Sequence, residues 1–158
     1  MNGFLFVNAA LASWNLGLRR ADATLSAFTD EQFYRQIAPG KNRVLYLVGH
    51  LTAVHDAMIP LLGIGDRLHP ELDEPFIKQP DRAVEDVPAP GKLRQYWTEV
   101  NTALNAGLLT LTPAEWLQRH NAVTDEEYAK DPTRNRLAVL LNRTNHLSYH
   151  NGQIVLAK

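Results

Sequence analysis

The sequence predicts an all-α protein, a four-helix bundle with a long proline-rich loop between its second and third helices. Three observations lead to this prediction. Apolar residues recur at three- and four-residue spacing in four long segments, capping signals mark several helix starts, and no segment alternates in the manner of a strand. The 158 residues match the size of one domain, so 1–158 are expected to form a single unit.

The first two long helices are expected at about residues 4–28 and 42–61. Each carries one continuous apolar stripe at helical spacing, and the second ends at a glycine-rich Gly-Ile-Gly stretch. Between them, the sequence Thr-Asp-Glu-Gln beginning at Thr29 is a capping box and predicts a short helical turn. Pro39 and Gly40 then break the chain before the second long helix begins.

Residues 63–91 are expected to form a long ordered loop, because five prolines exclude any long regular element. The loop contains seven acidic and three basic residues and therefore has a net charge of −4. Loops of this length inside a compact domain are usually functional covers or linkers. Two interpretations remain open at this stage, a solvated surface excursion and a lid over a functional site.

The third and fourth long helices are expected at about residues 92–109 and 132–156. Each again shows apolar residues on one face. Two further capping boxes lie between them, beginning at Thr112 and Thr124, and the first has a proline at its first helical position. Two short helices are therefore predicted in this connection, neither long enough to belong to the core.

Charge and composition exclude several classes of function. Sixteen Lys and Arg against 17 Asp and Glu give a net charge of −1, which leaves no surplus for binding nucleic acid. The chain has no cysteine, so it contains no disulfide, no thiolate ligand and no cysteine nucleophile. No apolar run suits a membrane span, and no Lys or Arg precedes the apolar residues 1–12, as an export signal requires. A cytoplasmic location is expected.

The strongest local signal is the run His146-Leu147-Ser148-Tyr149-His150 in the fourth long helix. Four residues advance a helix by about 400°, so the two imidazoles stand about 40° and about 6 Å apart and can reach one metal ion. A third histidine, His50, lies in the middle of the second long helix. The alternative for each is an ordinary core histidine whose ring is hydrogen-bonded.

The segments around these histidines resemble the DinB/YfiT-like superfamily of small four-helix metalloproteins. The resemblance is carried by Leu47-Val48-Gly49-His50-Leu51 and by Tyr149-His150-Asn151-Gly152-Gln153, and it extends over most of the chain. It implies a four-helix bundle of DinB/YfiT type, in which His50, His146 and His150 bind a divalent metal, commonly nickel or zinc. Many relatives have an arginine at the position of Asn151, so an anion contact at that point is not expected here.

Three neutral imidazoles leave at least one coordination position open, as in catalytic rather than structural sites. That position suits water or a thiol. The run lacks the glutamate that zinc peptidases of the H-E-x-x-H type place between their histidines, which argues against a peptidase. Because the chain has no cysteine, a thiol must come from a small molecule. The resemblance implies a thiol S-transferase, or a related hydrolase or isomerase, that acts on a small electrophile.

Two residues near the triad are candidates for supporting roles. Gln153 follows His150 by three residues and is placed to hydrogen-bond its imidazole, and Arg143 precedes His146 by three and is placed to hold a substrate carboxylate. The alternative for both is exposure to solvent. The expected partner is a small molecule, with no nucleic acid and no membrane, and a homodimer through an exposed helix face is compatible with the sequence. The alternative function is a non-catalytic metal-binding or stress-associated helical bundle.

Overall fold

A computed structural model describes residues 3–158 of the chain. It contains four long helices, α1 (Gly3–Ser26), α3 (Val44–Leu61), α4 (Pro90–Leu108) and α7 (Arg136–Val155). The shorter elements are α2 (Asp30–Phe33), a 3₁₀ turn η1 (Pro70–Leu72), a π-helical turn η2 (Glu74–Lys78), α5 (Pro113–Trp116) and α6 (Asp125–Lys130). Residues 3–158 form no strand and only two isolated bridges, so the predicted all-α fold is confirmed.

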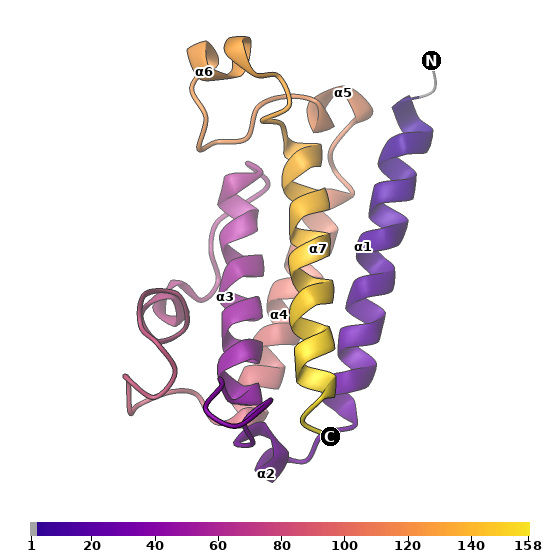
Figure 1. Cartoon of the computed structure of the whole chain (residues 1–158). Helices are drawn as coiled ribbons and strands as arrows, with labels where there is room; N and C mark the ends of the chain where they lie inside the picture. Colours follow the sequence, from indigo (N-terminus) through magenta and orange to yellow (C-terminus); the bar gives the residue numbers. More distant parts are fainter. Residues whose placement is uncertain (1–2) are drawn as a thin grey trace.

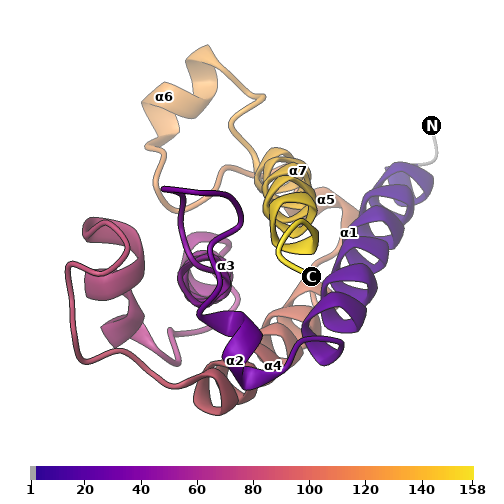
Figure 2. The same cartoon turned by 60° about the horizontal axis from the view of Figure 1, so that its bottom comes forward.

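The four long helices pack mainly as two pairs, α1 with α7 and α3 with α4, and α3 also contacts α7. Both members of each pair run in the same direction, which is visible in Figure 1. A parallel pair needs a long return connection, and residues 62–89 carry the chain from the end of α3 back to the start of α4. In the view of Figure 2 this connection lies outside the bundle, beside α3 and α4.

The core is formed by the apolar stripes of the long helices together with side chains of the short ones. Trp14, Phe33 and Trp116 are fully buried there. Among residues 3–158, only α3 is long and apolar enough to cross a membrane, and 72% of it is buried within the structure. An apolar helix that is covered on most sides is typical of the centre of a folded domain.

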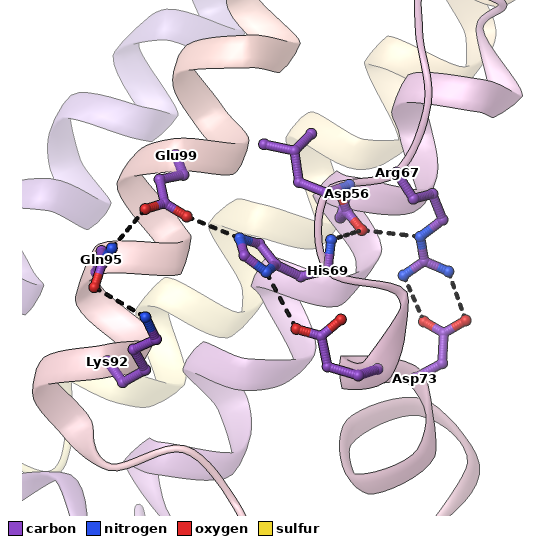
Figure 3. A network of polar contacts seen from close by, with 9 residues as sticks. Asp56, Arg67, His69, Asp73, Lys92, Gln95 and Glu99 are labelled. Atoms are coloured by element: carbon purple, nitrogen blue, oxygen red, sulfur yellow. Dashed lines mark hydrogen bonds and ion pairs between the residues drawn. The ribbon is translucent and has the colours of Figure 1, made fainter.

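A polar network attaches the connection to α3, as Figure 3 shows. The fully buried carboxylate of Asp56 accepts the backbone N–H groups of Leu68 and His69, and the Nε–H of Arg67 at 2.9 Å. Arg67 also donates two hydrogen bonds to Asp73, at 2.6 and 2.7 Å. Buried carboxylates are stable when all their acceptor positions are paired in this way, so the network holds this part of the chain in place.

Further contacts hold the same connection at two other points. His69 bridges to α4, where its Nε2 lies 2.9 Å from a Glu99 carboxylate oxygen and its ring stacks on Tyr96. Near the start of α3, Arg43 forms a 2.6 Å ion pair with Asp81. The connection is thus fixed along its length to both helices that it joins, and it includes two short helical turns.

Candidate metal centre

Three histidine rings converge between α3 and α7. His50 extends from α3, while His146 and His150 extend from successive turns of α7. The Nε2 atoms of His50 and His150 each lie 3.1 Å from Nε2 of His146, and the three candidate ligand atoms all lie within 4.8 Å of one another. All three residues are partly buried, so the nitrogen cluster is neither sealed in the core nor freely exposed.

The orientation of His50 is fixed by the connection between α3 and α4. Its Nδ1–H donates a 2.9 Å hydrogen bond to the backbone carbonyl of Phe76, which lies in the π-helical turn η2. The Phe76 ring packs onto α3 at Gly49, where a Cβ atom would stand 2.5 Å from the ring. The missing side chain at Gly49 therefore lets η2 approach closely enough for its carbonyl to reach the imidazole.

The orientation of His150 is fixed within α7. Its Nδ1 lies 2.7 Å from Oε1 of Gln153, one turn further along the helix. Nδ1 of His146 is buried and has no hydrogen-bond partner among the described residues. Two of the three rings therefore have a partner on the nitrogen that faces away from the cluster, which is the usual arrangement around metal-binding histidines.

Burial and the neighbouring charges keep the imidazoles of His146 and His150 neutral. Burial, followed by the neighbouring charges of His150, His50 and Arg143, lowers the pKa of His146 to about 4. Burial also lowers the pKa of His150, and its hydrogen bond to Gln153 opposes part of this effect. At neutral pH both rings are in the form that binds metal.

The proton positions on these rings make the fit to a cation specific. Since Nδ1 of His50 faces a carbonyl, which only accepts, that nitrogen carries the ring proton and Nε2 presents a lone pair. The same argument applies to His150 against Oε1 of Gln153. Neutral His146 carries one ring proton. On Nδ1, that proton would leave three lone pairs facing one another. On Nε2, it could be donated in only one of the two 3.1 Å contacts. A cation bound by all three nitrogens relieves this repulsion.

Comparison with known protein families is consistent with a metal centre at this position. The family model of the DinB superfamily matches residues 14–154, which is most of the chain. The chain belongs to the DinB superfamily. No curated protein matches it significantly. The matched region includes the three histidines, the connection that supports His50, and Gln153, so in this DinB protein the candidate centre lies inside the family's own domain.

Arg143 lies beside the cluster and does not join it. Its side chain is partly buried, and within residues 3–158 the guanidinium donates a single hydrogen bond, a long one of 3.4 Å to Oδ1 of Asn142. Nε of Arg143 is buried and has no partner among residues 3–158. Burial lowers the pKa of this guanidinium, and no carboxylate in the described part of the chain pairs with it to offset that effect.

The remaining histidines lie outside the group of converging nitrogens. His55 is fully buried between Trp14 and Trp97, and its Nδ1 lies 2.8 Å from Oδ1 of Asn101. His69 belongs to the network of Figure 3. The position of His55 agrees with helix geometry, because His55 is five residues from His50 and stands about 140° around α3 from it.

Sequence reasoning missed two contributors to the centre, Phe76 and Gly49. Phe76 acts through its backbone carbonyl, which no side-chain pattern reveals. Gly49 does leave a signal, because a glycine inside a helical pattern costs stability and usually has a packing reason. The glycine immediately before His50 could have pointed to a segment that packs against the helix there, although not to which segment.

Proposed function

We propose that His50, His146 and His150 bind a divalent metal, and that the protein is a metal-dependent enzyme that transfers a small-molecule thiol, or water, to a small electrophile. The observation that carries the proposal is the 3.1 Å approach of two Nε2 atoms to that of His146. Nickel and zinc are the favoured ions, since both are of intermediate softness and bind well to imidazole. Such an ion would lower the pKa of a thiol or water at an open coordination position.

The chain's own residues would orient the ligands and leave one side accessible. The Phe76 carbonyl and Gln153 hold the His50 and His150 rings with Nε2 toward the centre. Three protein ligands leave room for a substrate atom, in contrast to the four ligands of closed structural sites. DinB superfamily membership and a histidine group able to hold a metal both fit this function.

A thiol is favoured over water by what surrounds the cluster. Hydrolysis requires a general base within hydrogen-bond reach of the attacking water. Within the part of the chain that the structure describes, the group of potential ligands contains three histidines and no carboxylate. Thiol transfer does not require that base, because the ion itself favours the thiolate. We infer an S-transferase-like reaction. A related hydrolase or isomerase activity, on a different substrate, is the alternative.

Metal content tests the first half of the proposal. We expect the purified protein to bind one equivalent of zinc or nickel, and His50→Ala, His146→Ala and His150→Ala to lose most of it. His120→Ala removes a histidine that lies outside both the cluster and the connection between α3 and α4, and it serves as the matched control. If all three triad variants retain wild-type metal content, the triad assignment is wrong.

Catalysis is tested separately, by the rate at which small thiols add to a model electrophile with metal-loaded and metal-free protein. Acceleration only in the metal-loaded protein supports the enzyme. Stoichiometric metal without acceleration of any thiol or water reaction favours the alternative, a non-catalytic metal-binding or stress-associated bundle.

The proposal includes a cytoplasmic location and a small-molecule partner, and it is compatible with a homodimer.

A further inference from the structure

A second candidate site lies where α3 ends and α7 begins, which is the upper end of both helices in Figure 1. A cavity of about 370 Å³ lies between the end of α3, the first turns of α7 and the chain between α5 and α6. Apolar walls come from Ala122, Ala138 and Val139, and polar groups from His120, Arg134 and Arg143. A cavity of this size holds a small metabolite rather than a macromolecule.

The charges around this cavity are unbalanced. Arg134 and Arg143 both line it, and no Asp or Glu is among its described lining residues. Arg134 is partly neutralised by Glu127 at 3.3 Å. Arg143 has no carboxylate partner within the described chain, although its Nε is buried. A half-buried guanidinium without a counter-ion is costly, and an anion that enters the cavity would remove the cost.

The position of Arg143 relates this cavity to the metal centre. Arg143 and His146 are three residues apart on α7, which corresponds to about 4.5 Å along the helix axis and about 60° around it. The guanidinium is also near enough for its charge to lower the pKa of His146. None of the three histidines lines this cavity, and none lines the larger cavity of about 470 Å³ between α1 and α4. Arg143 is therefore the residue that connects the smaller cavity with the histidine cluster.

We propose that the cavity beside Arg143 binds the carboxylate of a small anionic substrate, and that Arg143 is the residue that recognises it. A single unneutralised guanidinium matches a monoanionic carboxylate, which it can bind through two parallel hydrogen bonds. The alanine and valine walls suit a short aliphatic chain. This inference rests on the proposed function for its substrate role, and it names the substrate class as small carboxylic acids.

An NMR titration of the isotopically labelled full-length chain tests the proposal with butyrate as the probe, in metal-free and zinc-loaded protein. We expect butyrate to shift the amide resonances of Ala122, Ala138 and Val139, and the neutral amide butyramide not to do so. Arg143→Gln should weaken butyrate binding at least tenfold, and Arg143→Lys, which keeps the charge but not the planar fork, should weaken it less. Arg20→Gln removes an exposed arginine of α1 and should leave binding unchanged.

Several outcomes would overturn the proposal. These are unchanged butyrate binding in Arg143→Gln, shifts confined to the cavity between α1 and α4, and tighter binding of inorganic phosphate than of butyrate at the same resonances. Failure of the metal assignment is distinguishable, because the titration of metal-free protein does not depend on the triad. Butyrate binding in a protein that does not take up metal would support this site and reject the metal centre.

Discussion

The ring of Phe76 lies directly on Gly49, at a distance that leaves no room for a side chain at that position. The contact brings η2 against α3, and the carbonyl of the same phenylalanine then accepts the Nδ1–H of His50. One packing contact between a helix and a distant part of the chain thus determines how a candidate metal ligand is oriented. π-helical turns such as η2 are often found at functional sites, where they redirect individual backbone groups.

Replacing Gly49 by alanine is expected to weaken metal binding. The added Cβ would stand 2.5 Å from the Phe76 ring, so η2 must move and the hydrogen bond to His50 is lost. We expect zinc affinity to fall about tenfold and the free energy of unfolding to fall by about 1–3 kcal/mol. A chromophoric chelator competition and a urea titration measure the two effects.

Gly152→Ala is the matched control for this substitution. Gly152 also lies in a helix close to a triad histidine, but a Cβ there meets nothing within 4 Å. Alanine should therefore preserve zinc affinity and raise stability by about 0.5–1 kcal/mol, because glycine is a poor helix former. Equal zinc affinities in the two variants would show that the Phe76 contact does not orient His50.

Gln153→Leu is expected to reduce metal affinity without unfolding the protein. The substitution removes the acceptor for Nδ1–H of His150, so that ring loses its fixed orientation and part of its basicity. Losses of supporting hydrogen bonds around metal ligands typically cost about 10–100-fold in affinity. Asn145→Leu changes an exposed amide on the same helix and should bind zinc as the wild type does. A Gln153→Leu protein with wild-type zinc affinity would contradict the role given to this contact.

The stability of the fold is expected to decrease on acidification, in part because of His55. Burial lowers the pKa of His55 to about 3 in the folded protein, against about 6.5 when the chain is unfolded. Between these pH values His55 binds a proton in the unfolded state but not in the folded state. Its contribution to the free energy of unfolding is therefore complete above pH 6.5 and is lost as the pH falls toward 3. The loss attributable to one such group is at most about 1.4 kcal/mol per pH unit.

Urea titrations of metal-free wild type and His55→Gln at pH 7 and pH 5 measure this contribution. The variant should lose less stability than the wild type over this interval, by up to about 2 kcal/mol. The other histidines are present in both proteins, so the difference isolates His55. Identical pH dependence in the two proteins would show that His55 does not contribute to the loss of stability at acidic pH.

Asp56→Asn is expected to release the connection between α3 and α4. The buried carboxylate accepts hydrogen bonds from Arg67 and from two backbone N–H groups. Its loss leaves the Arg67 guanidinium without one of its two carboxylate partners. We expect a destabilisation of about 3 kcal/mol, with faster amide hydrogen exchange over residues 67–78. Because Phe76 lies in this stretch, zinc affinity should fall as well.

Glu74→Gln provides the comparison for the Asp56 variant. Glu74 lies in the same connection, but its ion pair with Lys78 is exposed on both sides. Exposed pairs contribute little, so exchange rates and zinc affinity should stay at their wild-type values. An Asp56→Asn protein that matches Glu74→Gln in both measurements would mean that the network does not hold Phe76 in position.

Helix positions were largely predictable because they depend on neighbours in sequence. The capping boxes at Thr29, Thr112 and Thr124 each begin a helix in the structure, and both halves of each box form. The limits of the long helices differ from expectation by a few residues, most at the start of α7. That helix begins at Arg136, where the preceding Asn135 caps it through a hydrogen bond to the N–H of Ala138.

By itself, the sequence determined the all-α class, the order of helices and the pairing of His146 with His150, since each depends on residues within one or two helical turns. Only the tertiary structure decided the rest. The family resemblance implied that His50 joins His146 and His150, but the geometry of that group depends on contacts between residues far apart in the chain. The same is true of the position of Phe76 above Gly49 and of the uncompensated charge of Arg143. Such contacts follow from how whole elements pack, and local spacing carries no information about that packing.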